Sequence, residues 1–225
     1  MRTMSNNNKP DHRQLMTDFA IIILVLLLLA VFQSDMIFIA MYVLLSAYLV
    51  LTRRTGLFFP LATASLIATA WIYLARDYYA YDRNFHVIGN MNLWPWFAWA
   101  WGLFLVCYLY RGLEARYAIQ GRLNRLLVFS LMFWFLLLSA ETFAYHSLGL
   151  MNVATRGYGG LPWCDCIHGP AWMQAGYLAL GPLYFMLTRG LLLIVSRARR
   201  TARRHHPGDS RRHALRYLIS LFVRG

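Results

Sequence analysis

The sequence predicts an all-α, polytopic integral membrane protein: a six-helix transmembrane bundle followed by a short amphipathic C-terminal helix. Hydrophobic residues make up 59% of the 225 residues and charged residues only 14%, against about 25% charged residues in ordinary soluble domains. A soluble fold of this size has too little interior to bury so much apolar surface. The apolar residues also form long runs, and positive charges alternate between the segments that join them.

The apolar runs are long enough to cross a membrane as helices, since the roughly 30 Å hydrocarbon core needs about 20 residues. We expect helices rather than strands, because an open sheet would leave backbone groups unpaired in lipid. The six predicted helices are about 15–33, 36–52, 57–75, 91–110, 123–144 and 170–194. Residues 1–14 then form an N-terminal segment, 15–195 the transmembrane domain and 196–225 a basic tail.

The basic residues predict the orientation of the chain. With the N-terminus in the cytoplasm, 18 of the 22 lysines and arginines fall on cytoplasmic segments. Only Arg76, Arg83 and Arg156 fall on outer loops, and Arg189 lies within the sixth helix. This is the positive-inside bias, and it predicts a multi-pass protein of the bacterial inner (plasma) membrane with both termini in the cytoplasm. No nucleic-acid partner is expected, because the arginines lie between apolar runs and not on one polar domain.

The basic tail is expected to lie on the membrane surface. Its segment 210–223 places apolar residues at helical spacing beside arginines, namely Leu215, Leu218, Ile219 and Phe222 beside Arg211, Arg212 and Arg216. This pattern is typical of an interfacial helix that binds anionic lipid headgroups. Membrane lipids are therefore the first expected partners.

The sixth helix carries two features that bear on packing. Ala171, Ala175 and Ala179 form a stripe of small residues, which predicts close approach by a neighbouring helix. Pro182 removes one backbone hydrogen bond from the same helix and predicts a kink there.

The scarce acids and histidines gather on the predicted outer face. Five of the nine acids lie there, and so do three of the four histidines outside the tail: Asp35, Asp77, Asp82, Glu141 and Asp165, with His86, His146 and His168. The same face holds the two longest outer loops, 76–90 and about 145–169. Functional groups often lie on such loops above a rigid scaffold, so we expect the functional site on the extracytoplasmic face.

The segment 164–168 carries the sharpest local signal, a Cys-Asp-Cys-Ile-His sequence with prolines on both sides. In an extended chain Cys164, Cys166 and His168 would point the same way, which predicts a metal site suited to zinc or copper. The one-residue gap between the cysteines is shorter than usual for zinc. Two alternatives stay open: a disulfide or thiol-exchange pair, since thiols outside the cytoplasm tend to be oxidised, and cysteines that only pack.

Glu141 lies near the end of the fifth predicted helix, and His146 follows that helix by two residues. A carboxylate near the membrane interface is costly and is a functional candidate by default. Five residues of helix place the two side chains about 140° apart, so a direct pair would require the helix to end between them. The alternative is that Glu141 pairs with Arg76, Arg83 or Arg156 on the outer rim.

Two functions remain open at this point, and the sequence does not decide whether the protein is an enzyme. The first is a membrane enzyme that acts on a lipid or isoprenoid, with Glu141, His146 and Asp165 as acid–base catalysts. The second is a non-catalytic membrane subunit for metal handling, redox or scaffolding, whose outer loops bind a protein partner. A transporter is disfavoured, because the first three helices carry almost no polar residues within the bilayer.

Overall fold

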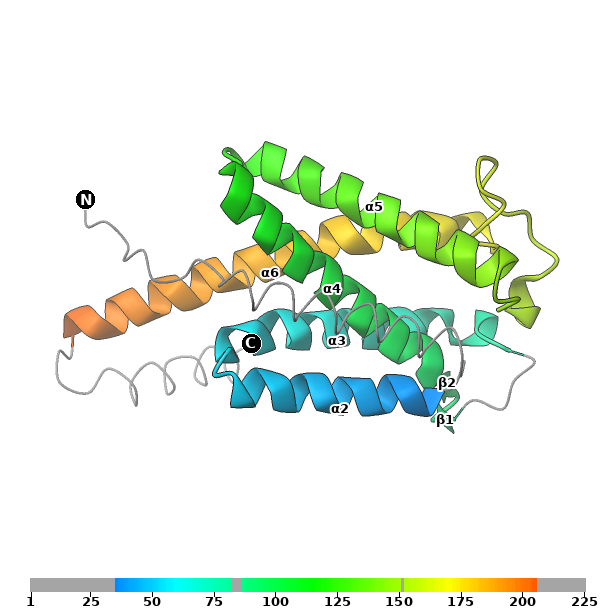
Figure 1. The fold of residues 1–225 in the computed structure, drawn as a ribbon, viewed down its shortest axis with the longest axis horizontal. Helices are drawn as coiled ribbons and strands as arrows, with labels where there is room; N and C mark the ends of the chain where they lie inside the picture. The colour runs from blue at the N-terminus through cyan, green and yellow to red at the C-terminus, as the bar shows by residue number, and fades with distance from the viewer. Residues whose placement is uncertain (1–34, 82–85, 151, 206–225) are drawn as a thin grey trace.

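The computed structural model describes residues 35–81, 86–150 and 152–205, with the side chains of all but residues 35, 55 and 193–205. These residues are mostly helical, as predicted (Figure 1). The helices are α2 (Asp35–Leu51), α3 (Phe58–Ala75), α4 (Leu93–Tyr117), α5 (Arg122–His146) and α6 (Ala171–His205). The predicted first helix, 15–33, and the predicted amphipathic helix, 210–223, lie outside the described residues.

Short elements join these helices. They are the 3-10 turns η1 (Thr55–Leu57), η2 (Arg76–Tyr78) and η3 (Val153–Thr155), and the strands β1 (Val87–Ile88) and β2 (Met91–Asn92). The two strands pair in antiparallel fashion. Gly89 and Asn90 join them with φ values of +55° and +61°, as the tight turns that suit a hairpin require. Residues 91 and 92, predicted as the start of the fourth helix, belong to this hairpin, so α4 begins at Leu93. The side chain of Asn92 caps α4 by accepting a hydrogen bond from the Trp94 N–H.

Successive helices run in opposite directions, so the connections gather at two ends of the bundle (Figure 1). One end, which we call the arginine end, holds the linker 52–57 between α2 and α3 and the linker 118–121 between α4 and α5. The opposite end, which we call the loop end, holds residues 76–92 and 147–170. α3 and α4 make the most extensive helix contact, and α6 packs against α3 and α5.

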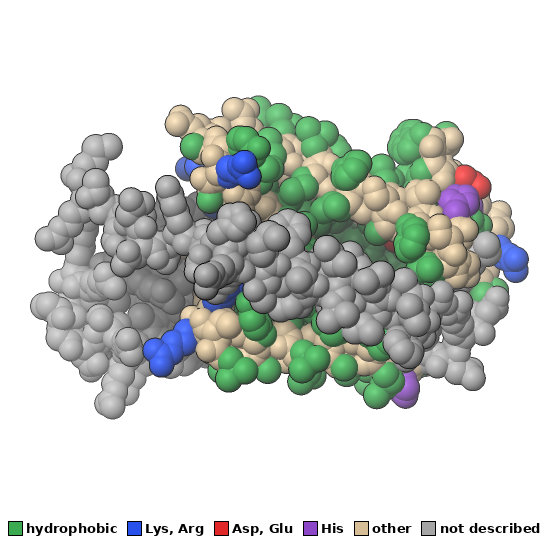
Figure 2. Space-filling view, viewed as in Figure 1, with side chains coloured by type: hydrophobic (Ala, Val, Ile, Leu, Met, Phe, Trp, Pro, Cys, Tyr) green, Lys and Arg blue, Asp and Glu red, His purple; other side chains and the backbone are tan. Residues whose placement is uncertain are grey.

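Three helical segments of the described chain are long and apolar enough to cross a membrane: Phe58–Tyr78, Leu93–Tyr117 and Arg122–His146. α2 is apolar but shorter. Large apolar side chains point away from the bundle, among them Leu66, Leu74 and Phe135, each about 70% exposed, and Figure 2 shows apolar side chains spread over the visible surface. Monomeric soluble proteins rarely expose so much apolar surface. The fold is therefore compatible with a membrane location.

The small residues that allow close packing of α6 are glycines and not the alanine stripe. Ala171, Ala175 and Ala179 are all exposed, so the prediction that they contact a neighbouring helix is wrong for the described residues. A Cβ added at Gly176 would overlap the ring of Trp71, and one at Gly181 would overlap the ring of Phe133. These positions lie on the faces of α6 that meet α3 and α5.

Candidate functional site

The loop between α5 and α6 contains a disulfide at the loop end of the bundle. Cys164 and Cys166 are bonded to each other, which is one of the three alternatives that the sequence left open. Cys166 is fully buried, whereas Cys164 is half-buried. Cys107, in α4, is a free cysteine.

Backbone contacts hold the disulfide loop in a tight turn. The Leu161 N–H donates to the Cys166 carbonyl at 2.8 Å, and the Asp165 N–H donates to the Leu161 carbonyl at 2.8 Å. Asp165 and Ile167 have φ values of +42° and +55°, a region that is strained for a β-branched residue. A Cβ at Gly160 would lie 2.8 Å from the backbone carbon of Asp165, so only glycine fits there.

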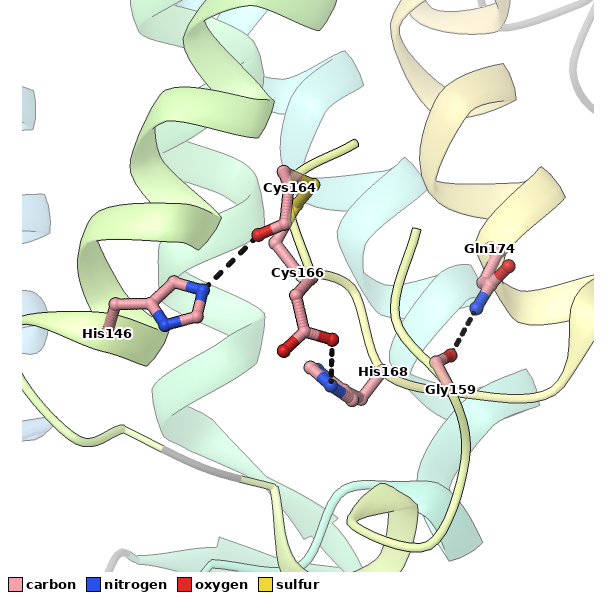
Figure 3. The surroundings of a disulfide bond; sticks show 7 residues. His146, Gly159, Cys164, Cys166, His168 and Gln174 are labelled. Atoms are coloured by element: carbon pink, nitrogen blue, oxygen red, sulfur yellow. Dashed lines mark hydrogen bonds and ion pairs between the residues drawn. A yellow bond between two sulfur atoms is a disulfide. The ribbon is translucent and has the colours of Figure 1, made fainter. Parts of the chain in front are cut away.

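Two histidines connect this loop to the end of α5 (Figure 3). His146 Nε2 lies 3.2 Å from the Cys164 carbonyl oxygen, and it must donate there because a carbonyl only accepts. His168 Nε2 lies 3.2 Å from Asp165 Oδ1, and its ring stacks on Tyr145 at 4.3 Å between centroids. The loop is therefore fixed to α5 at both sides of the disulfide.

The predicted metal ligands lie in one loop but do not form a metal site in this structure. The sulfurs of Cys164 and Cys166 are bonded to each other, and a disulfide offers no thiolate to a metal. No group of three His, Cys, Asp or Glu side chains in the described part of the chain is placed to hold a metal ion. A set of Cys164, Cys166 and His168 remains a prediction for the reduced protein.

The predicted acid–base residues are divided between two places. α5 continues through His146, so Glu141 and His146 stay on different faces of the helix. Asp165 is 72% exposed and faces His168. Among the described residues, no hydrogen bond or ion pair joins Glu141 to His146 or to Asp165. The structure brings His146, Asp165 and His168 around the disulfide.

The predicted alternative for Glu141, an ion pair on the outer rim, is not formed with the arginines that the structure describes. Arg76 lies 3.8 Å from Asp77, and both side chains are exposed. Arg83 lies outside the described residues. Glu141 is half-buried and lies near the tyrosines of the loop end.

Those tyrosines form a polar cluster that the sequence did not predict. The Tyr79 hydroxyl accepts hydrogen bonds from Trp71 Nε1 at 2.9 Å and from Trp99 Nε1 at 3.1 Å. It also lies 2.8 Å from the Tyr177 hydroxyl. Because two donors occupy its lone pairs, Tyr79 donates its own proton to Tyr177. Burial raises the pKa of Tyr79. The hydrogen bonds with Tyr177, Trp99 and Trp71 oppose this shift only in part, and the nearby carboxylate of Glu141 adds a smaller rise, so the phenol stays protonated.

Comparison with known proteins gives no further guide to the site. No protein-family model matches the chain, and no curated protein or solved structure is similar to it.

Proposed function

We propose that the chain is a multi-pass protein of the bacterial inner membrane whose extracytoplasmic loop carries a redox-active disulfide, which exchanges with the thiols of a protein partner. The observation that supports this proposal is the bond between Cys164 and Cys166 in a loop at the loop end of the bundle, opposite the arginine end. Disulfides persist outside the cytoplasm and are rare inside it.

The proposed topology has six transmembrane helices with both termini in the cytoplasm. The three long apolar helices of the structure support it, and the run 15–33, α2 and α6 complete the count. Arg53, Arg54, Arg111 and Arg116 lie near the arginine end, which the positive-inside bias assigns to the cytoplasm. The loop end then faces outward.

The chemistry follows from the unequal exposure of the two sulfurs. A partner thiolate attacks Sγ of Cys164, because Cys166 is fully buried. The bond between the two cysteines breaks, Cys166 leaves with the electron pair as a thiolate, and a mixed disulfide joins Cys164 to the partner. A second partner thiolate then attacks the partner sulfur and releases Cys164. The partner dithiol is oxidised to a disulfide, and this chain is reduced to a dithiol. The two protons of the partner thiols pass to the sulfurs of Cys164 and Cys166.

The surrounding side chains position the sulfurs for this exchange. His146 holds the Cys164 carbonyl, and the contacts of His168 with Asp165 and Tyr145 hold the other side of the loop. Both histidines are positioning residues. They keep Cys164 toward solvent while Cys166 stays packed behind it.

Trapping of the mixed disulfide tests the proposal. The full chain, purified in detergent, is incubated with a peptide that carries an internal disulfide, and the adduct is measured by mass spectrometry. Cys166→Ser leaves a free Cys164, which we expect to form the adduct several times faster than the buried thiol that Cys164→Ser leaves. Cys107→Ser keeps the disulfide and is the matched control: given the reduced, dithiol form of the peptide, it should oxidise that peptide at the wild-type rate. If the folded variants react at equal rates, or neither reacts, the proposal fails.

An enzyme acting on a lipid or isoprenoid is the second candidate, and Glu141 favours it. This carboxyl group is half-buried and lies near the hydrogen-bonded pair of Tyr79 and Tyr177. Such an arrangement can move a proton at the outer interface. Glu141→Gln should then change the lipid composition of cells that depend on the protein. Unchanged lipids with normal insertion would remove this candidate.

A further inference from the structure

A second polar cluster lies at the arginine end, far from the disulfide. Glu114 of α4 contacts two arginines: Arg125 of α5, whose Nε lies 3.1 Å from Oε1, and Arg189 of α6, whose Nη2 donates to Oε2. The Glu114 side chain is 19% exposed and the arginine side chains about 40%. Two guanidinium groups share one carboxylate, so one positive charge remains in excess.

A small cavity of about 30 Å³ lies beside this cluster, between α3, α4, α5 and α6. Its polar lining comes from Cys107, Tyr110, Arg111, Tyr184, Thr188 and Arg189. Arg111 adds a second excess positive charge at the cavity.

Two hydroxyl groups of the lining are buried. Tyr110 is 1% exposed and Thr188 is 4% exposed. Neither hydroxyl makes a well-aligned hydrogen bond with the described residues, although Tyr110 lies beside the Arg189 guanidinium and Thr188 beside the Tyr184 hydroxyl. The third hydroxyl, that of Tyr184, donates to the Pro60 carbonyl at 3.1 Å. An unsatisfied buried hydroxyl is costly, so the two free O–H groups define where a ligand would be bound.

We propose that this cavity binds a small monovalent anion of the size of chloride. Tyr110 and Thr188 donate their O–H groups to it, and Arg111 and Arg189 supply the charge that it neutralises. Its volume holds one such ion or about two water molecules. Water would satisfy the hydroxyls but would not neutralise the excess positive charge.

The proposal does not depend on the disulfide, and anion-dependent stability tests it. The full chain is purified in detergent in sodium gluconate, and chloride replaces gluconate at constant ionic strength while thermal unfolding is followed by tryptophan fluorescence. Because a ligand of the folded state raises its stability, we expect chloride to raise Tm by several degrees in a saturable way. Bromide should act in the same way.

Variants assign the effect to the cavity. Tyr110→Phe and Thr188→Val each remove one O–H donor and should abolish most of the shift. Tyr117→Phe, also on α4 but 64% exposed, is the matched control and should keep it. Equal Tm values in chloride and gluconate for the wild type, or a full shift in both cavity variants, would overturn the proposal.

A direct binding measurement covers the case in which a cavity variant does not fold. The wild-type chain should broaden the chloride NMR line, and bromide should reverse the broadening by competition. Absence of specific broadening would mean that water alone fills the cavity, and this too would overturn the proposal.

Discussion

The indole N–H of Trp134 donates a hydrogen bond to the backbone carbonyl of Leu178, with 2.8 Å between nitrogen and oxygen. Leu178 lies four residues before Pro182 in α6, so its carbonyl is the acceptor whose helical donor a proline lacks. A side chain of α5 therefore replaces the missing N–H of α6. The helix tolerates Pro182 because its neighbour satisfies the freed carbonyl.

Trp134→Phe should leave the Leu178 carbonyl unpaired and lower the free energy of unfolding by about 1–3 kcal/mol. Denaturant titration in detergent measures this loss. In a Pro182→Ala background the helix supplies its own N–H, so the cost of Trp134→Phe should be smaller there. The same cost in both backgrounds would show that the indole contributes only by packing.

The apolar runs predicted the first and last residues of a helix well where the helix ends with its apolar run. α3 and α5 match the predicted ranges 57–75 and 123–144 to within two residues at each end. α4 runs on to Tyr117, beyond the predicted end, because Glu114 pairs with arginines of two other helices and so makes a polar extension stable. Such pairing joins residues distant in sequence, and no local pattern reveals it.

The close contacts of α6 show the same limit of sequence reasoning. Spacing alone could not tell which small residues face a neighbouring helix, because this depends on how the helix is rotated in the bundle. Gly176 faces Trp71, whereas the alanine stripe faces outward. The hydrogen bond between Tyr79 and Tyr177 could not be predicted for a similar reason, because the two residues are 98 positions apart in the sequence.

Gly176→Ala should force a shift of Trp71 and cost about 1–3 kcal/mol of unfolding free energy, as overpacking does. Gly190→Ala on the same helix is the matched control, since a Cβ there meets nothing within 4 Å. It should be neutral or stabilising by up to about 1 kcal/mol. Denaturant titration of the two variants side by side checks the difference, and equal effects would contradict the packing.

The Tyr79 hydroxyl predicts how stability depends on alkaline pH. Burial is the main cause that raises its pKa above the ordinary value, which is about 10 in the unfolded chain. Folding therefore favours the protonated phenol, and this contribution is complete below pH of about 10 and decreases as the pH rises further. Tm of the wild type should fall above this pH, and the fall should be smaller for Tyr79→Phe, which has no proton to lose. Parallel curves would contradict this assignment.

Reducing the disulfide tests the prediction that Cys164, Cys166 and His168 bind a metal ion. The oxidised protein should bind no zinc at this loop, because the sulfurs are bonded to each other. After mild reduction, competition with a coloured chelator should detect zinc binding that Cys164→Ser and His168→Ala both weaken. Zinc binding that is equal before and after reduction would place the metal elsewhere or exclude this ligand set.

Two adjacent glycines allow a matched test of how the loop protects its disulfide. A Cβ at Gly160 would lie 2.8 Å from the backbone carbon of Asp165 and 2.9 Å from the Cys166 nitrogen, whereas one at Gly159 meets nothing within 4 Å. Gly160→Ala must therefore displace the turn that the contact between Leu161 and Cys166 closes. We expect the displaced turn to expose the buried sulfur of Cys166 to thiols.

We expect Gly160→Ala to speed reduction of the disulfide by dithiothreitol several-fold, because exposure of the attacked sulfur governs the rate of exchange. Gly159→Ala should be reduced at the wild-type rate. Alkylation of the released thiols at timed intervals, followed by mass spectrometry, gives both rates. If both variants are reduced at the same rate, the fit of the backbone at Gly160 does not protect the bond, and exposure of Cys164 alone controls its reactivity.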